Sequence, residues 1–210
     1  MSSPQDPPAT HEVPPLLGEE FAVEFANSIY RSPYESLDFL ETPAAVRSWF
    51  SQAQPAADLP LPQGITAELV RELRSVRDAV RTLLEHAAAT PGSGGPPSGP
   101  EVASALETLH ASARRACAHV ALDTVPSGGT GWTLVHDGVP HDVLIAGIAS
   151  RCILFLGGAD IDDVRACARP DCPMLFVRRH RARRFCHESC AHNLRQARYY
   201  RARTARTATR

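Results

Sequence analysis

Four cysteines in the last quarter of the chain constrain its fold more than any other feature. Cys167, Cys172, Cys186 and Cys190 form two close pairs separated by thirteen residues. Four thiolates complete the tetrahedral shell of Zn²⁺, and short chains supply them as two such pairs. A segment of about 40 residues with so few apolar side chains does not fold alone, whereas zinc contributes about 10–16 kcal/mol in comparable peptides. The spacing predicts a structural zinc site with these four ligands.

The alternatives around this cluster stay open at the level of sequence. The first alternative is that the four cysteines are buried residues with no shared role. The second is that a neighbouring histidine is a ligand, although His187 adjoins Cys186 and both cannot easily face one metal. We interpret the histidines as surface residues or phosphate contacts. The spacer, residues 173–185, is long enough for a hairpin, with Phe176 and Phe185 expected to pack on each other.

The charge of the chain is divided unevenly along its length. Residues 178–210 hold 11 arginines and one acid, a net charge of +10, and residues 1–177 hold 11 arginines and 22 acids, a net charge of −11. This asymmetry indicates a polyanionic partner for the basic end, or docking of the two halves on each other.

The basic end is a candidate nucleic-acid interface. Arginine binds phosphate with two hydrogen bonds and also recognises guanine edges, and Tyr199 and Tyr200 add stacking capacity. A helix after the last cysteine would gather several arginines on one face. The candidate contacts are Arg178, Arg179, Arg181, Arg183, Arg184, His192, Asn193, Arg195, Arg198 and Arg201.

The rest of the chain is expected to be mainly helical. Residues 1–15 are rich in proline and are expected to be disordered, and residues 91–100 read as a linker. Apolar spacing predicts helices over residues 16–28, from Pro43 through Phe50, from Thr66 to about residue 84, over 101–116 and over 141–156. Two short strands between residues 119 and 138 predict a β-hairpin. The fold class is therefore mainly α with a short β-hairpin: a helical N-terminal domain plus a small C-terminal treble-type zinc module.

Polar residues at the edges of two apolar helices suggest a small-ligand site. These residues are Glu24, Asn27, Ser28 and Arg77. The competing interpretation is that Asn27 and Ser28 only cap the first helix.

The sequence argues against membrane and catalytic functions. The N-terminus lacks a signal-peptide pattern, and the longest apolar run, residues 143–156, is too short to span a bilayer and contains Arg151. A cytoplasmic protein is expected. A closed four-cysteine site leaves no open metal position, and neither a Gly-rich phosphate loop nor a His-Glu-x-x-His motif occurs, so catalysis is not expected.

Residues 165–203, RACARPDCPMLFVRRHRARRFCHESCAHNLRQARYYRAR, resemble the CGNR-type zinc finger. The resemblance rests on both cysteine pairs, the Phe-Val dipeptide, the basic loop and the basic helix, although Cys-Gly-Asn-Arg itself becomes Cys190-Ala191-His192-Asn193. The N-terminal part is similar to the helical ABATE domain, with VEFANS at 23–28 resembling its Leu-Asp-Phe-Val-Asn-Thr signature. The family is described as stress-induced transcriptional regulators.

The resemblance implies a bacterial regulator in two parts. An ABATE-like domain over 16–158 would sense a small molecule or pair with a second copy, and a zinc finger over 160–203, followed by a basic tail over 204–210, would bind DNA. Two alternatives remain: an RNA-binding protein, or a ligand-binding or enzymatic N-terminal domain with a purely structural finger.

Overall fold

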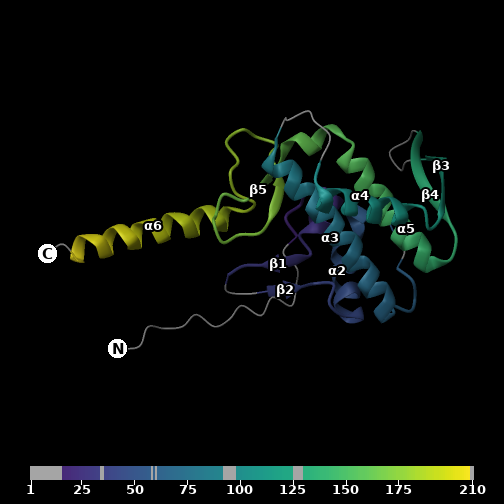
Figure 1. The fold of residues 1–210 in the computed structure, drawn as a ribbon, viewed down its shortest axis with the longest axis horizontal. Helices are drawn as coiled ribbons and strands as arrows, with labels where there is room; N and C mark the ends of the chain where they lie inside the picture. Colours follow the sequence, from purple (N-terminus) through teal and green to yellow (C-terminus); the bar gives the residue numbers. More distant parts are fainter. Residues whose placement is uncertain are drawn as a thin grey trace.

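The computed structural model describes residues 16–33, 36–57, 59, 61–91, 98–124 and 130–208. The predicted N-terminal tail lies outside these residues, as does most of the predicted linker. A helical body occupies one end of the molecule, and a single long helix leaves it at the other end (Figure 1). The structure confirms the predicted fold class, mainly α with short antiparallel hairpins and a small C-terminal module.

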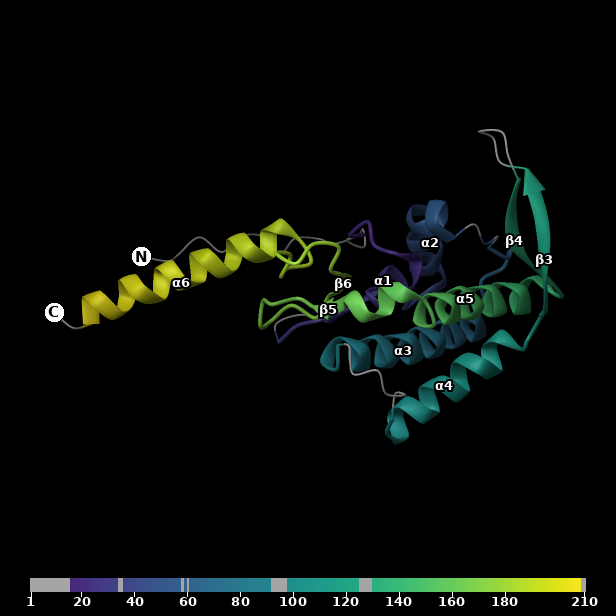
Figure 2. The ribbon, with the colours of Figure 1, turned by 90° about the horizontal axis from the view of Figure 1, so that it is seen from above.

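Five helices form the body and bury a common apolar core. The longest of them, α3, buries Leu69, Leu73 and Val76 almost completely. It runs beside α5, and α4 crosses below them (Figure 2). α5 is apolar on most sides because α1, α3 and α4 all contact it. The helices are α1 (Phe21–Ala26), α2 (Pro43–Ala57), α3 (Ala67–Ala89), α4 (Pro100–Ala113) and α5 (Pro140–Leu156).

Two helix starts follow the capping signals in the sequence. The hydroxyl of Thr66 accepts a hydrogen bond from the Leu69 N–H at 3.1 Å, and that of Thr42 accepts one from Ala45, also at 3.1 Å. Such caps satisfy N–H groups that have no partner within the helix. Pro43 takes the first position of α2, where its missing N–H costs nothing.

The first helix is shorter than the predicted 16–28. It begins only at Phe21, because Gly18 adopts a φ of +73° and the Glu24 side chain binds the backbone of the preceding segment. Glu24 Oε1 accepts hydrogen bonds from the N–H groups of Leu17, at 2.7 Å, and Glu19, at 2.8 Å. Leu17 therefore lies in a loop, and Ile29 begins a strand.

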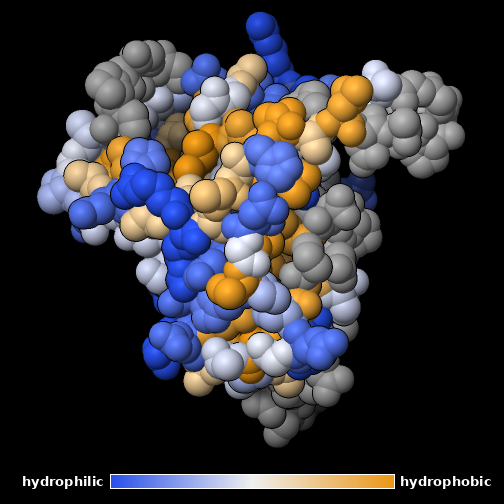
Figure 3. Space-filling view, turned by 90° about the vertical axis from the view of Figure 1, so that its right-hand side faces the viewer, coloured by the Kyte–Doolittle hydropathy of each residue, from blue (hydrophilic) through white to orange (hydrophobic). Residues whose placement is uncertain are grey.

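Three two-stranded antiparallel hairpins complete the described part of the chain. The predicted hairpin is confirmed, and it projects from the end of the body opposite the long helix. Figure 3 looks onto this end, where apolar residues gather among polar ones; Val120 and Leu122 are 67% and 80% exposed. The pairs are β1 (Ile29–Arg31) with β2 (Ser36–Asp38), β3 (Cys117–Thr124) with β4 (Thr130–Asp137), and β5 (Val164–Ala166) with β6 (Leu175–Val177).

The hairpin predicted inside the cysteine spacer is wrong. β6 lies in the spacer, but its partner β5 precedes the first cysteine, so the hairpin encloses the first cysteine pair instead. A short 3₁₀ helix, Ala159–Asp163, leads into β5.

The last helix, α6 (Glu188–Ala208), begins between Cys186 and Cys190, the second pair of predicted metal ligands. It continues past residue 203, where the predicted finger ended, and extends away from the body (Figures 1 and 2). Among the described helices, none is both long and apolar enough to cross a membrane.

Candidate metal centre and basic surface

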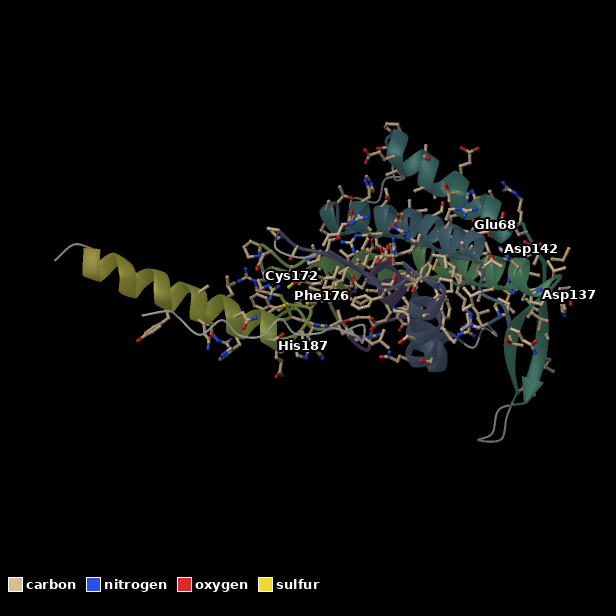
Figure 4. The ribbon with its side chains drawn as sticks, turned by 90° about the horizontal axis from the view of Figure 1, so that it is seen from below. Glu68, Asp137, Asp142, Cys172, Phe176 and His187 are labelled. Carbon is tan, nitrogen blue, oxygen red and sulfur yellow. The ribbon has the colours of Figure 1, made fainter. Side chains whose placement is uncertain are left out.

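Two local structures bring the four cysteines together. Cys167 and Cys172 lie in the loop that joins β5 to β6, where the Cys167 N–H donates to the Met174 carbonyl at 3.0 Å. Cys186 lies two residues before α6 and Cys190 lies in its first turn, and the Ala168 N–H donates to the Arg184 carbonyl at 2.9 Å. Figure 4 shows Cys172, Phe176 and His187 close together where α6 leaves the body.

The sulfur positions fit a tetrahedral metal. All four Sγ atoms lie within 4.8 Å of one another. The separations are 3.7 Å for Cys172 to Cys186, 3.6 Å for Cys186 to Cys190 and 3.8 Å for Cys190 to Cys172. A zinc ion about 2.3 Å from each sulfur requires sulfur separations of about 3.8 Å, so the donor set has the size that Zn²⁺ requires.

The metal-free cluster cannot hold four negative charges. Hydrogen bonds from the Cys172 and Cys186 thiols lower the pKa of Cys167 to about 2, helped by the Arg169 and Cys186 backbone N–H groups. The same hydrogen bond with Cys167 raises the pKa of Cys172 to about 12, and hydrogen bonds with Cys167 and Cys172 raise the pKa of Cys186. A divalent cation removes this conflict, because each sulfur then binds the metal as a thiolate.

Arg169 links this centre to the N-terminal domain. Its Nη2 donates to the Tyr30 hydroxyl at 3.1 Å, and its Nε lies 3.2 Å from an Asp171 carboxylate oxygen. Burial alone would lower the pKa of Arg169, but the negative charges of Cys190 and Cys172 raise it. Burial raises the pKa of Tyr30 in spite of the nearby guanidinium. Sequence reasoning did not single out either residue.

Arg183 holds the module together, although the sequence suggested a nucleic-acid contact. Its guanidinium donates to the carbonyls of Val177, Phe185 and Cys186 at 2.8–3.3 Å and lies 4.6 Å from the centroid of the Phe176 ring. It also forms a 2.6 Å ion pair with Glu19, whose side chain is 2% exposed. Since one guanidinium satisfies three carbonyls, Arg183 fixes the path of the spacer.

Two further arginines of the basic end are paired with acids. Arg179 Nη2 lies 2.9 Å from a carboxylate oxygen of Glu20, and Arg178 Nη2 lies 3.4 Å from one of Asp163. The ion pairs of Arg183 with Glu19 and of Arg179 with Glu20 show that the acidic and basic halves of the chain contact each other in part. This is one of the two interpretations of the uneven charge.

The other predicted contacts lie on the surface. Arg181, Arg184, His192, Asn193 and Arg195 are exposed, and we call these five residues the basic surface. His192 Nε2 lies 2.8 Å from Gln196 Nε2 one turn further along α6. Arg198 and Arg201 follow in the same helix, and the structure describes only their backbone.

The four residues of the predicted small-ligand site bind within the protein. Asn27 pairs with the backbone of Leu175, and the Ser28 hydroxyl donates to the Phe25 carbonyl at 2.7 Å. Glu24 Oε1 accepts the two N–H groups named above, while burial, the largest effect, raises its pKa. These contacts give the residues structural roles within the domain, and a ligand site at these residues stays a prediction.

Arg77, the fourth of these residues, is fully buried in α3. Its Nη1 lies 2.5 Å from Asp38 Oδ1, its Nη2 3.2 Å from Asp38 Oδ2, and its Nε 2.9 Å from Asp78. Burial would raise the pKa of Asp38, but hydrogen bonds from Arg77 and the Leu40 N–H lower it below its ordinary value. The pair fixes the β1–β2 hairpin to α3.

Two protein-family models match the chain, and the boundary between them falls between the helical body and the module that holds the four cysteines. The ABATE family model, described as "Putative stress-induced transcription regulator", matches residues 19–159. The CGNR zinc finger model matches residues 164–204. A search of curated proteins found no match. The finger match and the four gathered cysteines together confirm structural Zn²⁺ as the cofactor.

Proposed function

The chain belongs to the ABATE family and ends in a CGNR zinc finger, and from this premise we propose that it is a transcriptional regulator that binds DNA through its C-terminal end. Cys167, Cys172, Cys186 and Cys190 would hold the zinc ion, which supplies structure rather than chemistry. In this proposal residues 16–158 form the regulatory domain and residues 160–203 the finger.

One observation carries the proposal: α6 stands away from the body as a strongly basic helix that starts at the metal centre. Glu188 is the only acid between residues 178 and 210. Arg181, Arg184 and Arg195 are exposed, unlike Arg183, which the module uses for its own structure. An α-helix fits the major groove of DNA, and exposed arginines bind both phosphates and guanine edges.

The zinc centre gives this helix a fixed origin. Two of the four thiolates come from Cys186, just before α6, and from Cys190 in its first turn. The other two come from the loop between β5 and β6, and Asn27, directly after α1, binds the backbone of β6 at Leu175. A signal in the ABATE domain would therefore reach the helix through packed contacts rather than through a flexible linker.

Binding of the full zinc-loaded chain to a labelled duplex, measured by fluorescence anisotropy over a series of salt concentrations, tests the proposal. Phosphate binding predicts that log affinity falls linearly with log salt, with a slope of about −0.9 for each phosphate neutralised on B-DNA. A single-stranded RNA of equal length is the comparison, because the exposed Tyr199 ring offers a stacking face. Tighter binding to the single strand would favour the RNA alternative, and no binding to either at low salt would refute the proposal.

A further inference from the structure

A hollow beside the metal centre opens onto the cysteine sulfurs. It has a volume of about 460 Å³ and lies between the loop before α1, the β1–β2 hairpin and the start of α6. Leu17, Leu37, Phe39 and Met174 supply apolar walls, and Tyr30, Ser189 and Asn193 supply polar groups. Cys172, Cys186 and Cys190 also line the hollow, as do Arg169 and His187.

Cys172 is the most accessible of the four cysteines. The other three are only 5–8% exposed, whereas Cys172 is half-buried and faces the hollow. The labelled view shows it near Phe176, where α6 leaves the body (Figure 4). A reagent that enters the hollow therefore meets the Cys172 sulfur before it meets a fully buried one.

The charge around the hollow selects the kind of molecule that reacts there. Four thiolates outweigh one Zn²⁺ by two negative charges, and the Arg169 guanidinium offsets part of this excess. Electron-rich sulfur disfavours an anion, and the apolar walls disfavour a strongly hydrated cation. Thiolate is the nucleophilic form of cysteine, so the sulfur suits a neutral, largely apolar electrophile.

We propose that Cys172 is a modification site for small α,β-unsaturated carbonyl compounds. The Cys172 thiolate forms a bond to the β-carbon of the acceptor, the carbon–carbon π electrons move towards the carbonyl, and the α-carbon takes a proton from water. Tyr30, Ser189 and Asn193 line the same hollow and can donate a hydrogen bond to the carbonyl oxygen. No oxidant or reductant takes part.

The product is a thioether, which has no negative charge to offer a metal. Cys172 then no longer acts as an anionic ligand, and the loop between β5 and β6 loses one of its two bonds to the start of α6. This reaction takes place at the zinc centre and does not depend on whether α6 binds DNA.

Methyl vinyl ketone is a suitable probe, used on the full zinc-loaded chain. The exposed Cys117 would react independently, so a Cys117→Ser background removes it. Peptide mass mapping locates the adduct, and a chromogenic chelator follows zinc release in the same sample. The first adduct is expected on Cys172, at a rate about tenfold above that of any other zinc-site cysteine, with zinc release following it.

A pocket-filling variant provides the matched control. Leu37→Trp would fill part of the hollow without replacing a metal ligand, and it should slow the reaction at Cys172 severalfold while the zinc content stays unchanged. Adducts spread evenly over the four cysteines, or zinc release before any adduct forms, would overturn the proposal, because the reagent would then only trap cysteines that the metal had already left.

Discussion

The side-chain amide of Asn27 pairs with the backbone of Leu175 as a neighbouring strand would. Its Nδ2 donates to the Leu175 carbonyl at 2.9 Å, and its Oδ1 accepts from the Leu175 N–H at 3.0 Å. Two residues further on, the Val177 N–H donates to Glu19 Oε2 at 3.0 Å. Residues on both sides of α1, Glu19 before it and Asn27 after it, therefore satisfy the free edge of β6, and the finger is docked on the ABATE domain.

Replacing Asn27 with Ala should lower the free energy of unfolding by about 2–4 kcal/mol, because two buried backbone groups of Leu175 lose their partners. Ser28→Ala is the matched control. Its hydroxyl only donates to the Phe25 carbonyl, so the cost should be about 1 kcal/mol. Denaturant unfolding measures both variants, and equal losses would contradict the special role of the Asn27 amide.

Arg183→Lys should weaken the zinc site although it keeps the positive charge. A lysine can still pair with Glu19, but it cannot reach three carbonyls at once, so the spacer loses its fixed path. Competition with a chelator should show zinc affinity lower by about 10-fold or more. The neighbouring exposed Arg181 offers the comparison, since Arg181→Lys should leave zinc affinity unchanged.

One zinc ion per chain is expected, with four thiolates as its ligands. Cys190→Ser should abolish stable zinc binding and expose the C-terminal end to protease, because the β5–β6 loop and α6 would no longer be held together. Cys117→Ser, which changes an exposed cysteine outside the cluster, should keep the full zinc content. A Cys190→Ser protein with one tightly bound zinc would refute the ligand assignment.

The sequence predicted the metal site better than its surroundings. Cysteine spacing is a local property, and the sulfurs meet as expected. The role of Arg183 depends on the path of the spacer and on Glu19, about 160 positions away in the chain, which no local pattern reports. The net charge showed that the two halves can attract each other, but it could not separate the arginines paired with Glu19 and Glu20 from those that remain exposed.

The fold was predicted in the same way: features within one segment were predicted, and contacts between distant segments were not. Capping residues and apolar spacing indicated α2, α3 and α5, because these signals lie within each helix. The start of α1 was predicted too early, since the apolar spacing that predicted a helix over residues 16–28 begins in a segment that Gly18 and Glu24 hold out of the helix. The partner of β6 was missed because three-residue strands carry too little pattern to show pairing.

The pKa of Glu24 gives a test of stability against pH. Burial raises this pKa above 4.5, so the folded protein binds a proton more tightly at this site than the unfolded chain does. Stability from this residue is complete below the unfolded value and falls as the pH rises through the folded one. Glu24→Gln still accepts the N–H groups of Leu17 and Glu19 and removes the titration.

The Glu24→Gln protein should therefore gain thermal stability over the native protein as the pH rises from below 4.5 towards neutrality. Melting curves across this range check the effect. Glu68→Gln is the control for the substitution itself, since it makes the same chemical change at an exposed position in the first turn of α3. A variant that is less stable at neutral pH and equal in acid would show that the carboxylate is stabilising as an anion.

Nucleic-acid affinity should reside in the basic surface rather than in the arginines that the module uses internally. Replacing Arg184 and Arg195 together with Ala should reduce the slope of log affinity against log salt by about two units, since each phosphate neutralised contributes about 0.9. Binding should weaken on every duplex sequence alike, because phosphate contacts position a protein without reading bases. Zinc content should not change, because both side chains are exposed and Ala keeps the Arg184 carbonyl that accepts from the Ala168 N–H. The matched control replaces Arg47 and Arg114, two exposed arginines of the N-terminal domain, and should leave the slope unchanged. Equal loss in both double variants would mean that net charge alone governs binding, and an unchanged slope in the first would place the interface away from α6 and the loop before it.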